Sequence, residues 1–226
     1  MITIISDLLS SEEVSVFQQA LASVAWVNGR ETAGHIAAQV KENEQLPLDH
    51  PVGRDLGEII LTALSQCPEF LAATLPARIL PPRFNRYQSG GTYGNHIDNA
   101  VFAIPGSSDR LRSDISATLF LSDPDEYDGG ELVIEDTYGT QTIKLPAGHL
   151  MVYPASSVHR VNPVSRGARV ASFFWVQSLV REDHKRRMLL ELDQSIQALT
   201  LHNADTQTVA RLTGVYHNLI REWSNP

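Results

Sequence analysis

The chain has 226 residues, a formal net charge of −8 at pH 7 and one cysteine, Cys67. This composition excludes an intramolecular disulfide framework, and it disfavours nucleic-acid binding because the Lys and Arg residues form no basic stripe that could neutralise phosphates. No apolar run approaches the ~18 residues of a membrane span and no basic leader opens the chain, so we expect a cytoplasmic protein without membrane contact.

Two helices are predicted in the first third of the chain. Ser10 can cap a helix over residues 10–23, in which Val14, Phe17 and Leu21 share one face. A second apolar face at helical spacing predicts a helix over residues 51–71. Residues 29–48 are polar and less regular. We therefore expect residues 1–75 to form a helical support region that packs on the rest of the fold.

From residue 77 the pattern changes to short β-rich segments separated by Gly and Pro, which is typical of antiparallel strands in a sandwich or barrel. We predict strands near residues 77–88, 93–98, 114–122, 131–136, 139–145, 149–153, 157–163 and 168–178. The fold class is thus α+β, with a mainly β core over residues 76–178. Residues 99–114 interrupt the strands as a polar loop, which we expect to close over a substrate.

After residue 178 the strand-like alternation ends. Residues 179–199 and 204–223 each have a helical pattern, so residues 179–226 are predicted to be a C-terminal helical extension. The apolar faces of these helices must bury against each other, against the β core or against a second subunit. The last case would give a homo-oligomer.

His96 and Asp98 are the first candidates for a functional site. They are two residues apart on a predicted strand, so their side chains project from one face and can hold one side of a metal ion. With His159 they make two histidines and one carboxylate, the facial triad of non-haem iron(II) oxygenases. The alternative for His96 and Asp98 alone is a structural hydrogen-bonded pair; His159 and Arg169 favour the metal site.

Arg169 is the fourth candidate. The runs 157–161 and 169–175 flank Pro163, Ser165 and Gly167, which predicts a β-hairpin with Arg169 facing Val161. Diagonal neighbours on one sheet face are about 7 to 8 Å apart, so the guanidinium can reach the pocket in front of His159. There it can bind a carboxylate through two parallel hydrogen bonds.

Three segments together resemble a known family: the stretch from Phe84 to Asn99, which holds His96 and Asp98; Asp128-Gly129-Gly130-Glu131-Leu132; and the segment from His159 to Arg169. In this order they resemble the iron(II)- and 2-oxoglutarate-dependent dioxygenases of prolyl-4-hydroxylase type, most closely the bacterial PKHD-type hydroxylases. The resemblance covers residues 76–178, and the C-terminal helices are similar to an extension of that branch. It implies a double-stranded β-helix (jelly roll) with flanking N-terminal helices.

The resemblance also implies cofactors and roles. Fe(2+) would be held by His96, Asp98 and His159, and Arg169 would bind the distal carboxylate of 2-oxoglutarate. Two aromatic residues would complete the site: Tyr87 on the same carboxylate and Trp175 near the metal. O2 would be the other co-substrate and L-ascorbate the reductant. The implied reaction hydroxylates a C–H bond of a primary substrate and releases succinate and CO2.

Three alternatives remain open at this point. A nucleic-acid repair dioxygenase of the same broad superfamily would need a basic groove, which the composition does not suggest. A cupin-like metal enzyme that does not use 2-oxoglutarate would share the barrel, but it would leave Arg169 unexplained. A jelly-roll module that only binds a metal or ligand would be expected to lack a metal ligand, and all three are present. The primary substrate is unidentified, since a peptidyl proline is only the family analogy and a siderophore-related small molecule is equally open.

Overall fold

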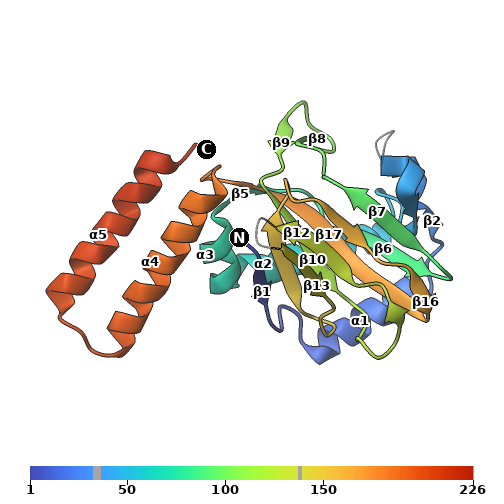
Figure 1. Ribbon diagram of the computed structural model, residues 1–226, viewed down its shortest axis with the longest axis horizontal. Coiled ribbons are helices and arrows are strands. Elements are labelled where there is room, and N and C mark those ends of the chain that lie inside the picture. Colours follow the sequence, from blue (N-terminus) through green and yellow to red (C-terminus); the bar gives the residue numbers. More distant parts are fainter. Residues whose placement is uncertain (33–36, 137–138, 226) are drawn as a thin grey trace.

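Two antiparallel sheets form the body of the protein (Figure 1) in the computed structural model, which describes residues 1–32, 37–136 and 139–225. The larger sheet has the strand order β1-β14-β10-β17-β6-β4-β2, and β5 also pairs with β17. Its strands are β1 (Thr3–Ile5), β2 (Val27–Asn28), β4 (Glu44–Gln45), β5 (Pro76–Ile79), β6 (Arg83–Gln88), β10 (Ile115–Phe120), β14 (Leu150–Pro154) and β17 (Ala168–Ser178).

The second sheet has the order β13-β12-β15-β7-β3. Its strands are β3 (Lys41–Glu42), β7 (Thr92–His96), β12 (Leu132–Asp136), β13 (Gly139–Ile143) and β15 (His159–Val161). Two short pairs complete the strands: β8 (Val101–Ala103) with β9 (Arg110–Arg112), and β11 (Asp128–Gly129) with β16 (Val164–Arg166). One buried cluster joins the inner faces of the two larger sheets, with Phe120 and Met151 on one side and Leu132 and Ile134 on the other.

Helices cover the outer face of the larger sheet. They are α1 (Ser11–Ala22), α2 (Pro51–Ser65) and α3 (Pro68–Thr74), with short 3-10 turns η1 (Gly29–Thr32) and η2 (Ala37–Val40) before β3. Strand β10 is buried along its whole length because Ala117 and Leu119 pack with the helices, whereas Ser116 and Thr118 face the cavity between the sheets. The larger sheet is therefore a central layer with side chains packed on both faces.

The N-terminal helices agree only in part with the sequence prediction. Ser10 caps α1 as predicted, and the capping box with Glu13 is complete. The single helix expected over residues 51–71 is wrong, because the chain forms α2 and α3 with Cys67 between them. Pro68 explains the break: its ring disfavours the helical conformation at Cys67, but it fits the first turn of α3.

Three strand predictions also need correction. The strand expected over residues 77–88 is two strands, β5 and β6, separated at Pro81 and Pro82. Strand β7 ends at His96, so Asp98 lies beyond it. The hairpin that would place Arg169 opposite Val161 is wrong: Arg169 lies opposite Tyr87 in the larger sheet, and Val161 opposite Tyr93 in the second. The chain changes sheets through β16, where Gly167 has a φ of 71°.

The segment over residues 99–114 is more ordered than the predicted loop. Strands β8 and β9 pair as a hairpin, with Val101 opposite Arg112. Leu111 is buried, and the ring of Phe102 stacks on Trp175 with 4.1 Å between centroids. This hairpin therefore packs against the same aromatic residue that lines the cavity between the sheets.

The C-terminal residues form a helical hairpin of α4 (Asp183–Leu201) and α5 (Thr206–Trp223), as predicted in outline. Figure 1 shows the pair beside the sheets, with α4 next to α3 and α5 outermost. Leu189 of α4 packs with Leu219, Ile220 and Trp223 of α5, so the apolar faces meet each other. In the part of the chain that the structure describes, no helix has the length and apolar character needed to cross a membrane.

Candidate metal centre and active-site cavity

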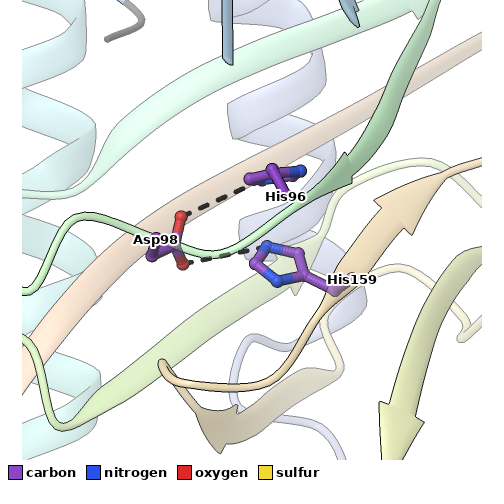
Figure 2. A group of neighbouring side chains, drawn as sticks. All are labelled: His96, Asp98 and His159. Atoms are coloured by element: carbon purple, nitrogen blue, oxygen red, sulfur yellow. Dashed lines mark ion pairs between the residues drawn. The ribbon is translucent and has the colours of Figure 1, made fainter. Parts of the chain in front are cut away.

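The second sheet brings His96 and His159 together. His96 is the last residue of β7, His159 is the first residue of β15, and the two lie opposite each other in the register of this pair. Asp98, two residues past the strand end, turns back toward both rings (Figure 2). His96 Nε2 lies 3.9 Å from Asp98 Oδ1, and His159 Nε2 lies 3.8 Å from Asp98 Oδ2. One ligand atom from each residue lies within 4.8 Å of the others.

The remaining ring nitrogens fix how the two imidazoles face the centre. His96 Nδ1 lies 2.8 Å from the carbonyl oxygen of Gly94, and His159 Nδ1 lies 3.0 Å from that of Ser157. A carbonyl oxygen can only accept a hydrogen bond, so each Nδ1 carries a proton, and the other ring nitrogen, Nε2, is directed at Asp98. Metal-binding histidines are oriented in this way. Three electron-pair donors thus converge, an arrangement that fits a cation.

Further contacts hold these donors in place. The Ser116 hydroxyl donates a hydrogen bond of 2.5 Å to Asp98 Oδ2. The ring of Tyr93 stacks on His96 with 3.5 Å between centroids, and Tyr153 meets His159 edge-on at 5.1 Å. His159 is only 5% exposed. Each of the three candidate metal ligands is therefore oriented by a neighbouring side chain that would not itself bind the metal. This reduces the reorganisation needed to bind an ion.

Burial makes His96 a weak base. Desolvation, with repulsion from His159, lowers the pKa of His96 to about 4, and the Gly94 carbonyl and Asp98 oppose this shift. The imidazole is therefore neutral at pH 7. A metal ion has no proton to displace from this ligand.

The low pKa of His96 predicts an acid-sensitive metal-free protein. An unfolded histidine titrates near pH 6.5, so on acidification the unfolded chain takes up this proton first. The contribution to stability is complete above pH 6.5 and is lost as pH falls toward 4, by on the order of 3 kcal/mol. Urea denaturation of the metal-free protein at several pH values would measure the loss.

Two variants test whether His96 is the cause. His96→Gln should lose less stability than the parent over this pH interval, whereas His217→Gln, a change at an exposed histidine, should lose as much as the parent. Equal losses in all three proteins would contradict the assignment.

Arg169 lies in the larger sheet and reaches into the same cavity as the histidines. It is 1% exposed, and its guanidinium lies between the rings of Tyr87 and Phe120, 5.5 and 5.1 Å from their centroids. Its Nε has no hydrogen-bond partner, and none of the described carboxylates forms an ion pair with it. A buried cation without a counter-ion is costly, so this site is suited to an anionic ligand.

The Gly129-Gly130 pair before β12 has a structural reason, which is clearest at Gly130. Gly130 has a φ of 68°, and a Cβ at this position would lie 3.1 Å from Arg169 Cδ and 2.9 Å from both Tyr127 and Val164. A side chain there would press on the stem of Arg169. The absence of a side chain at Gly130 therefore leaves space for the side chain of Arg169, in addition to allowing the expected irregular turn.

The cavity runs along β17, from Arg169 at one end to Trp175 at the other. Arg169, Phe173 and Trp175 line it from that strand, and Tyr87 and Arg83 line it from β6 beside them. Trp175 lies opposite Ser116, the partner of Asp98, so the tryptophan is at the end near the two histidines. Arg169 is six residues from Trp175 along the same strand, and its guanidinium lies beside Tyr87 and Phe120. Tyr87, buried beside Arg169, has its pKa raised to about 12 chiefly by desolvation, although Arg169 opposes the shift.

The polar residues of the cavity that sequence reasoning missed include Lys41, Arg83 and Ser116. Arg83 and Ser116 have a signal in the sequence, because Arg83 has the same strand parity as Tyr87 and Ser116 interrupts an apolar strand. Lys41 has none, since it belongs to the irregular segment before α2 and reaches the cavity only because β3 pairs with β7.

The β core is similar to that of a known class of proteins. The sequence profile of the 2OG-Fe(II) oxygenase superfamily matches residues 82–177, which include every candidate residue discussed so far except Lys41. A prolyl hydroxylase from Trichoplax adhaerens, solved with a hypoxia inducible factor peptide fragment, is similar in fold with a TM-score of 0.56 and 19% identity, over 83% of this chain and 86% of that one. A Pseudomonas putida prolyl-4-hydroxylase gives 0.52 and 19%, over 78% and 92%.

The C-terminal helices and the whole-length relatives narrow the class. The profile of the PKHD-type hydroxylase C-terminal domain matches residues 183–225, which hold α4 and α5. PKHD-type hydroxylases of Parvibaculum lavamentivorans and Stenotrophomonas maltophilia are 57% and 58% identical to this chain, over 98% and 97% of both sequences respectively. The chain belongs to the PKHD-type hydroxylase family. It is an Fe(II)- and 2-oxoglutarate-dependent dioxygenase, as the motifs predicted.

Proposed function

We propose that His96, Asp98 and His159 hold Fe(II), and that Arg169 binds the distal carboxylate of 2-oxoglutarate. One observation carries the proposal: three electron-pair donors converge near one end of a cavity that has a buried guanidinium without a counter-ion near the other. A co-substrate that chelates a metal at one end and carries a carboxylate at the other matches both features. A cupin-like enzyme without 2-oxoglutarate would leave the charge of Arg169 uncompensated.

In this proposal the protein binds and orients the reactants and excludes water from them. Ser116 fixes the rotation of the Asp98 carboxylate, and the Gly94 and Ser157 carbonyls fix the two imidazoles. Tyr87 assists Arg169 at the distal carboxylate, and Trp175 shields the metal end from solvent. Bound iron and 2-oxoglutarate supply the oxidising chemistry, in which O2 gives one oxygen atom to succinate, formed with loss of CO2, and the other to a substrate C–H bond.

Several further assignments belong to the same proposal. Residues 76–178 supply most strands of the two facing sheets, which form a double-stranded β-helix with β1 to β4 toward the edges. Residues 1–75 support it with the helices α1 to α3, and residues 179–226 form a separate helical extension. L-ascorbate would serve as the reductant that keeps iron ferrous. A homo-oligomer through α4 and α5 would use the surface that these helices leave exposed, because their apolar faces already meet each other.

Ferrous iron and 2-oxoglutarate added together without oxygen should give the weak visible metal-to-ligand charge-transfer band of this chelate. The donor set and Arg169 are the reason to expect it. Iron alone and 2-oxoglutarate with Zn(II) are the matched controls, and neither should absorb there. A folded sample that retains iron but shows no band would count against the co-substrate assignment. After admission of oxygen, mass spectrometry would follow succinate and screen candidate substrates for the gain of one oxygen.

A further inference from the structure

A second cationic surface lines the cavity near the metal site. Arg83 of β6 and Lys41 of β3 line the same cavity as His96, Asp98 and Trp175. The guanidinium carbon of Arg83 lies 5.3 Å from the centroid of the Trp175 ring, so it stacks over the aromatic side chain at that end. Along β6, Arg83 is four residues from Tyr87, or about 13 Å in an extended strand. It therefore lies apart from the Arg169 site.

Arg83 differs from its neighbour on the same strand. Arg86, of opposite parity on β6, points away from the cavity and pairs with Glu44 at 2.7 Å. No described carboxylate pairs with Arg83, and burial lowers the pKa of its half-buried guanidinium. The positive charge of Arg83 therefore faces the cavity without a protein counter-ion.

Lys41 adds to this positive charge. Its Nζ lies 5.3 Å above the ring of Tyr93, which stacks on His96. Burial first, and then repulsion from Arg83, lower the pKa of Lys41 to about 8, while attraction to Asp98 opposes the shift. Two cations close enough to repel each other therefore line the same cavity. An anion bound between them would relieve the repulsion and replace lost solvent.

We propose that Arg83 binds a carboxylate of the primary substrate, so that this enzyme acts on an acid whose apolar part packs against Trp175 and Phe102. The inference rests on the proposed function, because the metal triad fixes where the reacting C–H bond must lie. A neutral prolyl peptide would leave Arg83 without a counter-ion. The carboxylate can come from a small organic acid or from an acidic side chain next to the hydroxylated residue of a peptide.

The test uses the full-length enzyme, loaded with ferrous iron and saturating 2-oxoglutarate without oxygen, so that the Arg169 site is filled. Two matched pairs of probes are titrated: benzoate against benzamide, and acetyl-Phe-Asp-amide against acetyl-Phe-Asn-amide. Binding is followed by tryptophan fluorescence and by perturbation of the charge-transfer band. The parent should prefer the carboxylate of at least one pair by about ten- to hundred-fold, the range expected for a charged hydrogen bond. The preferred pair distinguishes a small acid from an acidic peptide.

Three variants make the result specific. Arg83→Gln should lose the preference for the carboxylate while its affinity for 2-oxoglutarate stays at the parent value. Arg83→Lys should keep part of the preference, and the matched control Arg86→Gln should keep all of it. Equal binding of acid and amide by the parent in both pairs, or a preference retained by Arg83→Gln, would overturn the inference. Weakened 2-oxoglutarate binding in Arg83→Gln would also overturn it, because Arg83 would then belong to the co-substrate site. A parent without the charge-transfer band would instead refute the proposed function, and this inference with it.

Discussion

Replacing His159 with Ala should abolish stoichiometric iron binding. His159 is one of only three donors in the proposed site, and it is buried with its Nε2 aimed at Asp98. Changes to residues that merely support a metal ligand cost about 10- to 100-fold in affinity, so removal of a ligand should cost more than that. Iron content after desalting, measured by a ferrous chelator or by mass spectrometry, should fall from near one ion per chain to background.

The control for this variant is His149→Ala. His149 is half-buried but lies outside the cavity, 3.8 Å from Asp7, so its loss should leave the iron content unchanged. Circular dichroism at pH 7.5 would establish that both variants are folded. If folded His159→Ala still holds one iron per chain, the ligand set of His96, Asp98 and His159 is wrong.

Replacing Arg169 with Lys should preserve iron binding and weaken 2-oxoglutarate binding about ten- to hundred-fold. A single ammonium cannot reproduce the two parallel hydrogen bonds of a guanidinium, and each bond to a charged group contributes about 1.5 to 3 kcal/mol. Titration of the charge-transfer band with 2-oxoglutarate would give the dissociation constant. Arg169→Met, which keeps the length but removes the charge, should weaken binding further.

Arg166→Lys is the matched control for this second prediction. Arg166 is exposed and pairs with Asp128, so exchanging its charged group should leave the dissociation constant unchanged. An Arg169→Lys variant that binds 2-oxoglutarate as tightly as the parent would place the distal carboxylate elsewhere. Arg86 is then a poor substitute, because it faces Trp26 and Glu44 on the other side of β6.

The proposed ligand residues, which the structure brings together, could be singled out in the sequence because their chemistry is local and unusual. Two histidines, one carboxylate and an arginine in a fixed order identify a narrow set of reactions. Their spatial arrangement was only partly predictable. The sequence correctly placed Arg169 in the cavity, but for the wrong reason, since its neighbour in the sheet is Tyr87 and not Val161. Strand pairing depends on long-range packing, which alternation within one strand does not specify.

Lys41 and Arg83 show a different limit of prediction from the sequence. A cation in a strand or in an irregular segment is usually solvent-exposed. Strand parity places Arg83 on the same face as Tyr87 and Arg86 on the opposite face, but it does not say which face lines the cavity. Only the register of β6 against β17, and of β3 against β7, separates the residue that faces the cavity from the one that pairs with Glu44. Such residues become visible only once the sheet is assembled.

The difference in burial between Arg169 and Arg83 has a kinetic consequence. Arg169 is almost completely buried at one end of the cavity, while Arg83 and Trp175 lie at the other end beside the β8–β9 hairpin. If 2-oxoglutarate binds at Arg169 and the acid at Arg83 as proposed, 2-oxoglutarate lies deeper in the cavity than the acid. Turnover should therefore follow a compulsory sequence, in which 2-oxoglutarate enters before the acid to be hydroxylated and succinate departs after the hydroxylated product. The same geometry would make an excess of the acid an inhibitor that delays the next round by occupying the entrance.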